Sequence, residues 1–238
     1  MASETLSSNN QNIQDLIQAF KNASSRKRRN LVPLIEKRTE ELSEIAPSFI
    51  SSFDREGDDW APGFILQVLN RYQKNLLVNI LKPYDGNWLL TPSAVGIDYL
   101  PLQEFLLEEK FEEADRFTSS KLRELAGTNA IDRGYVYFSE VQTISGIDLL
   151  TLDRLWVVYS QAKFGFSVQA RILDSLGGLY EKLWSRIGWK NEGVWTRYPK
   201  SFNWSIDAPE GHMPLVNQLR GVRLMDSLLN HSSSFSRR

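Results

Sequence analysis

The sequence of 238 residues contains no cysteine and only two histidines, His212 and His231. Without cysteine the chain can form no disulfide, and thiolate metal sites and cysteine nucleophiles are excluded as well. A histidine metal site or a Ser-His-Asp triad would have to depend on one of the two histidines. These absences favour a protein that binds a ligand or a partner over one that makes and breaks bonds.

The sequence also lacks a long apolar run and an excess of charge of one sign. No apolar segment approaches the ~20 residues that a membrane helix requires, and the N-terminal segment MASETLSSNNQN has no apolar signal core. The 28 Lys and Arg residues nearly balance the 29 Asp and Glu residues. No overall positive field therefore draws the chain to nucleic acid, and any basic site must be local.

The hydrophobic content of 42% is enough for a sizeable core, and its periodicity is helical along most of the chain. A Pro- and Gly-rich segment, 81–101, marks a boundary between two helical halves. We therefore predict an all-α fold in which an N-terminal helical bundle (11–83) is followed by an all-helical core domain (96–230). The polar ends, 1–10 and 231–238, are expected to be flexible tails.

Two segments need a separate interpretation. GYVYFSEVQTI (134–144) has the composition of a strand but no partner strand, so we predict an extended loop that presents Tyr135, Tyr137 and Phe138. Proline suits the first position of a helix, so we predict that the last helix begins at Pro214.

Neither of the two charged clusters in the N-terminal half predicts a binding function. The run RKRR (26–29) stands between two helical patterns, and we interpret it as a solvated turn rather than a nucleic-acid patch. The acidic loop SSFDREGDDW (51–60) resembles a calcium loop around Gly57, but it lacks the full pattern and its terminal Glu. Acidic residues are in any case favourable at a helix N-terminus. We therefore predict no metal site.

The segment GWKNEGVWTRYPKSFNWSIDAPEGHMP (188–214), which we call the aromatic loop, carries many large rings for a loop. Solvated loops are normally polar and small, so these rings must contact the core, a partner or a ligand. Three tryptophans beside or within helical patterns are expected in the core: Trp156, Trp184 and Trp189. Three rings in the irregular part are candidates for ligand contact: Trp195, Tyr198 and Phe202. Trp204 fits either role.

Six blocks of the sequence carry a resemblance when they are taken in order. They are DDWAPGFILQVL (58–69), FEEADRFT (111–118), LAGTNAIDRGYVYFSEV (125–141), LDRLWVVYSQAKFGFSVQ (152–169), IGW (187–189) and APEGHMPLVNQLRG (208–221). The series, and above all YSQAKFGFSVQ followed by APEGHMP, resembles the genomes-uncoupled family of tetrapyrrole-binding proteins, which regulate magnesium chelatase. The resemblance is strong over about 98–229 and looser over the N-terminal helices, as in the cyanobacterial members.

The resemblance implies an all-helical core, shaped like a cupped hand, that binds protoporphyrin IX or Mg-protoporphyrin IX. It implies no catalytic residue and no catalytic cofactor, and it implies action on the large porphyrin-binding subunit of magnesium chelatase. The setting would be the cytoplasm of a cyanobacterium or the plastid stroma. We expect a monomer that binds no nucleic acid and leave peripheral membrane association open. The chain departs from the family pattern at Ala162-Lys163, where Gly-Arg is usual, and at Ile172-Leu173, where many members have Ile-Trp.

A porphyrin is a flat apolar disc with two propionates on one edge, so its binder needs an apolar surface and a few cations at the rim. Arg220 and Arg223 flank the apolar face of the predicted last helix, which includes Val222 and Met225. From the spacing alone, a solvated pair bonded to Asp226 is the preferred interpretation. The resemblance instead places basic residues of this helix near the porphyrin. The ligand-binding residues predicted on this basis are Phe138, Val141, Trp195, Tyr198, Phe202, Met213, Asn217, Arg220 and Arg223.

Three alternatives stay open. His212 could be an axial ligand to magnesium, although a hydrogen bond from its ring to the loop ahead of Pro214 is the simpler interpretation. A helical protein-interaction module without a ligand, which docks through the aromatic loop, is the alternative to porphyrin binding. An enzyme acting on tetrapyrroles could use Glu112, Glu113 and Asp115, but a charged helix face explains these carboxylates without chemistry.

Overall fold

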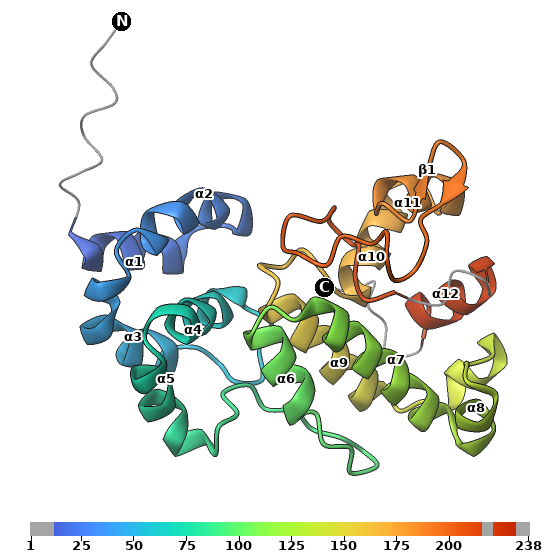
Figure 1. The fold of residues 1–238 in the computed structure, drawn as a ribbon, viewed down its shortest axis with the longest axis horizontal. Coiled ribbons are helices and arrows are strands. Elements are labelled where there is room, and N and C mark those ends of the chain that lie inside the picture. Colours follow the sequence, from blue (N-terminus) through green and yellow to red (C-terminus); the bar gives the residue numbers. More distant parts are fainter. Residues whose placement is uncertain (1–11, 216–220, 232–238) are drawn as a thin grey trace, which may run out of the picture.

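Figure 1 shows a chain folded into helices joined by turns and loops, which confirms the predicted all-α class. The computed structural model describes residues 12–215 and 221–231. Within the aromatic loop, a short hairpin pairs β1 (Lys190–Asn191) with β2 (Val194–Trp195) in antiparallel orientation. Among the described residues, no helix has both the length and the apolar character needed to cross a bilayer.

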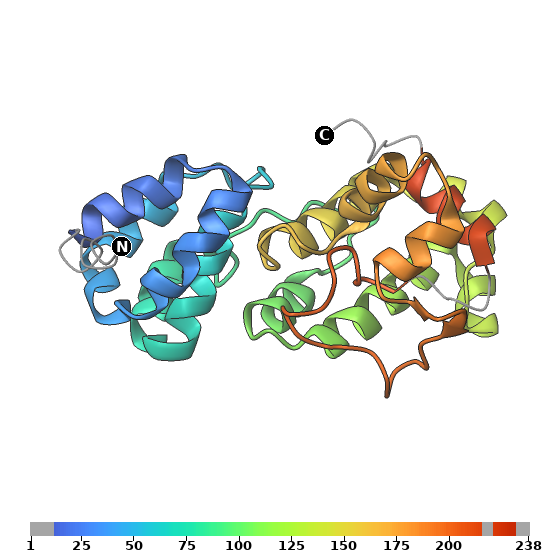
Figure 2. The same cartoon turned by 90° about the horizontal axis from the view of Figure 1, so that it is seen from above.

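The helices form two groups that lie side by side, joined by the segment that follows η2 (Figure 2). The elements of the first group are α1 (Ile13–Asn22), α2 (Ser25–Glu36), η1 (Thr39–Glu41), α3 (Leu42–Ser51), α4 (Trp60–Tyr72), α5 (Lys74–Leu81) and η2 (Lys82–Tyr84). Besides the hairpin, those of the second group are α6 (Leu100–Leu107), α7 (Phe111–Ala126), α8 (Thr128–Arg133), η3 (Phe138–Thr143), α9 (Gly146–Val158), α10 (Phe166–Ser175), α11 (Tyr180–Arg186) and α12 (Gly221–Leu229).

Helix α4 is shared by both groups. Every side chain from Trp60 to Leu69 is buried. On one side the ring of Phe20 in α1 contacts Trp60 and Phe64, with centroids 5.4 and 5.5 Å apart. On the other side α4 packs against α6 and α9. A helix that is buried all round needs neighbours on every side, so α4 belongs to the core of both groups at once.

The seam between α4 and the second group is closed by a close backbone approach and a buried amide. A Cβ added at Gly63 would lie 2.3 Å from the carbonyl oxygen of Val158, so only glycine lets α4 come this close to α9. Gln67 is 3% exposed, and its Nε2 donates to the carbonyls of Leu106 at 2.9 Å and Tyr159 at 2.8 Å. These carbonyls lie at helix C-terminal ends, where intrahelical donors run out. The Leu106 carbonyl also accepts the Glu109 N–H at 3.1 Å, so the amide adds a second donor there and satisfies the Tyr159 carbonyl at the seam.

The run at 26–29 lies inside α2, so the prediction of a solvated turn is wrong. Arg28 is buried, and its guanidinium pairs with both carboxylate oxygens of Asp59. Asp59 is also the N-cap of α4, where an acid is favourable. Arg29 reaches across the seam and donates to the carbonyl of Gln161 at 2.9 Å. These arginines join α2 to α4 and to the second group.

Residues 138–143 form the short 3-10 helix η3 in place of the predicted extended loop. The Tyr137 N–H donates to Glu140 Oε2 at 2.7 Å, and the Glu140 N–H donates to the Tyr137 carbonyl at 3.0 Å. These two local bonds satisfy the backbone without a partner strand. Tyr135 and Tyr137 remain outside η3, with their ring centroids 5.3 Å apart.

The last helix does not begin at Pro214. This residue follows a cis peptide bond and lies in a bend, and the next N–H, of Leu215, donates to the carboxylate of Asp115 at 2.6 Å. The segment is thus held by α7, and within the described residues α12 begins at Gly221. Of the two predicted tails the structure describes only His231, which is buried.

Candidate functional site

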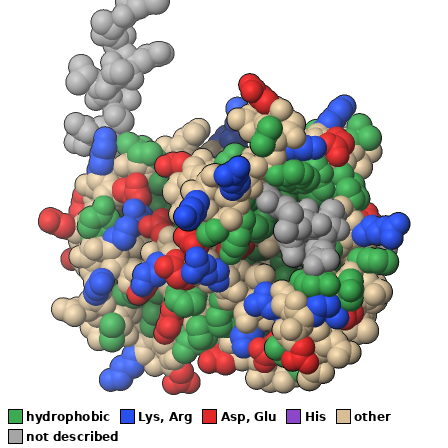
Figure 3. Space-filling view, turned by 45° about the vertical axis from the view of Figure 1, so that its right-hand side comes forward, with side chains coloured by type: hydrophobic (Ala, Val, Ile, Leu, Met, Phe, Trp, Pro, Cys, Tyr) green, Lys and Arg blue, Asp and Glu red, His purple; other side chains and the backbone are tan. Residues whose placement is uncertain are grey.

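A cavity of about 50 Å³ lies where α7, η3 and α12 meet, and we call it the α7–α12 cavity. Its lining is mainly aliphatic and includes one charged side chain, that of Arg123. Figure 3, with the right-hand side of the molecule turned forward, shows hydrophobic side chains on the right half of this face with Lys and Arg side chains among them. The lining residues are Ser119, Leu122, Arg123, Gly134, Tyr135, Val136, Val141, Ile144, Leu215, Leu224 and Leu228.

Three of the predicted ligand-binding residues lie on η3 and α12, two of the elements that bound this cavity. Val141 lines it and is buried. Phe138 is the first residue of η3 and is 44% exposed, and the guanidinium carbon of Arg223 in α12 lies 5.6 Å from its ring centroid. A guanidinium over an aromatic face is favourable, so the contact links η3 to α12. Asn217 and Arg220 lie outside the described residues.

The described contacts of Asp226 do not include Arg223. Asp226 accepts from the hydroxyl of Tyr180 at 2.9 Å and from Nδ2 of Asn230 at 3.0 Å. The core face of α12 also differs from the prediction, because Val222 is 40% exposed. The buried side chains of α12 are Leu224, Met225, Leu228 and Leu229. Arg223 precedes Leu224, which is buried and lines the cavity, and the described contact of its guanidinium is with the ring of Phe138.

Several rings of the aromatic loop pack within the protein itself. Trp189 is 1% exposed and lies parallel to Trp184, with centroids 5.5 Å apart and planes inclined by 7°. Its Nε1 donates to the carbonyl of His212 at 2.7 Å. Trp156 is also buried. The expectation that these three tryptophans belong to the core is confirmed.

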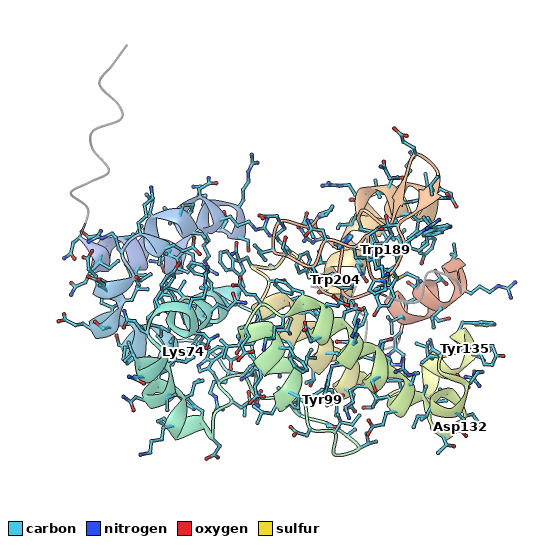
Figure 4. The ribbon with its side chains drawn as sticks, in the orientation of Figure 1. Lys74, Tyr99, Asp132, Tyr135, Trp189 and Trp204 are labelled. Carbon is cyan, nitrogen blue, oxygen red and sulfur yellow. The ribbon has the colours of Figure 1, made fainter. Side chains whose placement is uncertain are left out.

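The other predicted residues of the aromatic loop do not line the α7–α12 cavity. Phe202 and Met213 are buried, and Phe202 stacks on Trp204 with centroids 5.5 Å apart. Trp195 and Tyr198 are exposed, at 38% and 43%. Figure 4 shows Trp189 and Trp204 in the region of the aromatic loop and Tyr135 beside α8. The loop thus builds a small aromatic core of its own, and contact of these residues with a ligand stays a prediction.

His212 is held by the end of α11 rather than by the loop ahead of Pro214. Its Nδ1 lies 2.6 Å from the carbonyl oxygen of Ile187, so Nδ1 carries the proton that forms this bond. Burial lowers the pKa of His212 below its ordinary value, which keeps the ring neutral. The ring of Phe202 lies 4.9 Å away. His212 does not line the α7–α12 cavity, so the geometry gives no support to an axial role there.

Asp115 is a buried carboxylate on α7 that contacts the chain just after the aromatic loop. It is 1% exposed, and it accepts the Leu215 N–H at 2.6 Å and has the Tyr198 hydroxyl as a second donor. Burial raises the pKa of Asp115 to about 7 despite these two donors. The carboxylate therefore fastens two points of the chain around the aromatic loop to α7.

The helical spacing of α7 contains the signal that places Asp115 inside. Phe111, Asp115, Thr118 and Leu122 are all buried and recur at intervals of three and four residues. The prediction of a charged, solvated face is therefore right for Glu113, which is exposed, and wrong for Asp115. The sequence interpretation gave the charge of Asp115 more weight than its position on the buried face of α7.

The site offers an apolar enclosure and cations, and these suit an apolar ligand that carries carboxylates. Among the described residues, no group of three or more His, Cys, Asp or Glu side chains is placed to hold a metal ion. The aliphatic lining supplies contact, Arg123 in the lining supplies positive charge, and Arg223 adds a second cation on α12 next to Leu224. Fold and site together define a helical protein with a small, apolar pocket bordered by arginine.

Comparison with known proteins identifies the family. Residues 92–232 match the family model described as GUN4-like. The Ycf53-like protein of Synechocystis sp. is 40% identical over 222 residues, which cover 92% of this chain and 95% of that protein. The chain therefore belongs to the GUN4-like family, which confirms the resemblance carried by its sequence blocks.

Two further relatives match part of the chain. The chloroplastic tetrapyrrole-binding protein of Arabidopsis thaliana is 34% identical over 139 residues, which are 55% of this chain and 52% of that protein. The structure of GUN4 from Chlamydomonas reinhardtii superposes with a TM-score of 0.58 at 38% identity and covers 61% of this chain and 93% of that one. The solved relative is thus similar to a part of this chain only.

Proposed function

We propose that the chain binds one molecule of protoporphyrin IX or Mg-protoporphyrin IX in the α7–α12 cavity. In this proposal it stimulates magnesium chelatase through the chelatase's large porphyrin-binding subunit and catalyses no reaction itself. The observation that carries the proposal is an apolar cavity bordered by arginine, in a family with a tetrapyrrole-binding member. The origin of the relatives supports action in the cytoplasm of a cyanobacterium or in the plastid stroma.

Approximate free energies indicate how much the apolar lining and the arginines would each contribute to ligand binding. Burial of roughly 300 Å² of apolar ligand surface is worth about 7 kcal/mol at about 25 cal/mol/Å². A hydrogen bond to a charged group adds about 1.5–3 kcal/mol, and less where it is exposed to water. Association itself costs much of this gain. Apolar contact therefore sets most of the affinity, and arginine sets orientation and ligand choice.

Binding a porphyrin requires the cavity to widen. Its volume is about 50 Å³, whereas pockets for ligands of this size measure roughly 300–1,000 Å³. The cavity is bounded by α12 on one side and by η3 and α7 on the others, and α12 packs directly against η3. Separation of α12 from η3 opens the apolar lining, and the Arg223–Phe138 contact is one that this movement would break or rebuild.

We expect the purified chain to bind protoporphyrin IX one to one, with a shifted Soret band and quenched tryptophan fluorescence. Ser119 lines the cavity, so Ser119→Phe should fill it and weaken binding by about tenfold or more, by analogy with an overpacked core. The matched control is Ser43→Phe, because Ser43 is exposed on α3 in the first group of helices and does not line this cavity. An unchanged Soret band and unquenched fluorescence at micromolar porphyrin would contradict the proposal.

We also propose that residues 96–230 form the binding core and that 11–83 form a supporting bundle. All residues that line the cavity lie between Ser119 and Leu228. A fragment from Gly96 onward is therefore expected to keep its porphyrin affinity within severalfold, measured by the same titration. Its stability should be lower, because removal of α4 exposes the face of α9 that carries Val158. A folded fragment that has lost all binding would show that the site needs both parts.

A protein-interaction module without a ligand is the second candidate. It is favoured by the exposed hairpin, where Val194 is 71% and Trp195 is 38% exposed. Solvent-exposed apolar side chains of this kind often mark contact surfaces. The porphyrin titration separates the two candidates, because a docking patch alone gives no change in the Soret band.

A further inference from the structure

Arg123 differs from neighbouring cations in its electrostatic partners. Arg133 pairs with Glu140 at 2.6 Å, and Lys121 pairs with Glu124 at 2.7 Å. No described carboxylate pairs with Arg123. Glu140 and Glu124 therefore each pair with a cation other than Arg123.

The position of Arg123 is costly without an anion. Its side chain is half-buried, and its described hydrogen bond is a long one, from Nη1 to the hydroxyl of Ser119 at 3.4 Å. It lines the apolar α7–α12 cavity and also an adjoining, more open hollow of about 460 Å³ whose other lining residues are Ser120, Glu124, Ile131 and Gly134. The carboxylate of Glu124 is paired with Lys121, so a guanidinium held there loses part of its hydration without an ion pair of its own among the described residues. An anionic group delivered by a ligand would supply that charge.

We infer that Arg123 receives a carboxylate of the ligand in the α7–α12 cavity. This inference rests on the proposed function, and it adds to it a second cation on a different helix from Arg223. The apolar part of the ligand lies against the aliphatic lining, and one carboxylate lies toward the hollow beside Arg123. A guanidinium suits this role because its planar donors match a carboxylate in two parallel hydrogen bonds.

The test compares protoporphyrin IX with its dimethyl ester, using the full chain and tryptophan quenching. Arg123→Gln keeps the aliphatic stem but removes the charge, and it should weaken binding of the acid by about tenfold while leaving the ester unchanged. Arg123→Lys should fall between the native chain and Arg123→Gln, because it keeps the charge without the planar donors. The control is Arg171→Gln on α10, which makes the same change at an exposed arginine that pairs with Glu210 at 2.9 Å and lines neither the cavity nor the hollow, so it should affect neither ligand.

Each outcome decides the inference. Loss for the acid alone supports it. Equal losses for acid and ester mean that Arg123 supports the fold, and no loss for either means that it does not contact the ligand; both results overturn the inference while the proposed function stands. A native chain that binds neither porphyrin removes the proposed function and this inference with it. If Arg123→Gln fails to fold, the ratio of acid to ester affinity in Arg123→Lys decides between the same outcomes.

Discussion

The variant Asp115→Asn is expected to gain stability over the native chain as the pH rises from 5 to 7, and to keep that gain at higher pH. Asn is close to Asp in shape and can still accept the Leu215 N–H, but it carries no charge that burial can penalise. The measurement is urea unfolding of both proteins at pH 5, 6, 7 and 8.

The direction of this change of stability with pH follows from the raised pKa of Asp115. Burial moves the pKa of Asp115 from 3.8 to about 7 on folding. Its contribution to stability is therefore fully present below 3.8 and is lost as the pH rises to about 7, because the folded protein holds a proton that the unfolded chain has released. Each pH unit in this window is worth about 1.4 kcal/mol. The advantage of the Asn variant should thus grow by about 2–3 kcal/mol between pH 5 and 7.

The matched control for this experiment is Glu113→Gln, two positions away on the same helix. Glu113 is exposed, so the control should show the same pH profile as the native chain. Parallel profiles for Asp115→Asn and the native chain would mean that Asp115 titrates like a solvated carboxyl, and that the region around Tyr198 and Leu215 is open to water.

The variant Gly63→Ala is expected to destabilise the protein by about 2–3 kcal/mol, although alanine favours a helix over glycine by about 1 kcal/mol. The added Cβ would lie 2.3 Å from the carbonyl oxygen of Val158 and 2.8 Å from its Cγ1. Backbone cannot rotate away as a side chain can, so α4 and α9 must separate, at the cost typical of an overpacked core. Chemical denaturation measures the loss, and limited proteolysis within 85–99 measures how far the seam opens.

A glycine with more room serves as the control. A Cβ at Gly57 would lie 3.3 Å from the carbonyl oxygen of Asp54, and this glycine does not have a positive φ. Gly57→Ala should therefore change stability by less than about 1 kcal/mol. If Gly63→Ala matched the native chain in stability, the close approach of α4 to Val158 would not be a feature of the folded protein.

Helical spacing was sufficient to predict the class of the fold and the rings that fill its core. Trp156 and Trp184 fall on apolar helical positions, Trp189 follows the end of α11, and all three are buried. The same spacing could not show which residues from other elements cover a given face of a helix. Arg28 is buried because Asp59 lies opposite it, and Asp115 is buried because a backbone N–H from a distant loop meets it. Both partners are set by tertiary structure, which the local pattern does not contain.

The candidate site was predictable in a different way. Val141 and Phe138 entered the prediction through family resemblance, and the structure places Val141 in the cavity and Phe138 beside Arg223. Arg123 follows Leu122 on the buried side of α7, but the sequence does not show that nearby acids are already paired. The sequence also could not show that Phe202 packs on Trp204, because aromatic rings pack on each other as readily as on a ligand.

The continuous burial of α4 has a consequence for biosynthesis. The ribosome releases the chain from its N-terminus, so the shared helix ending at Tyr72 leaves before α9, which ends at Val158. At about 5–20 residues per second, the delay is on the order of ten seconds. Throughout that interval one apolar side of α4 lacks its cover and can meet another nascent chain. Slower translation between these points would lengthen the exposure, and a chaperone that shields α4 in this window would raise the yield of folded protein.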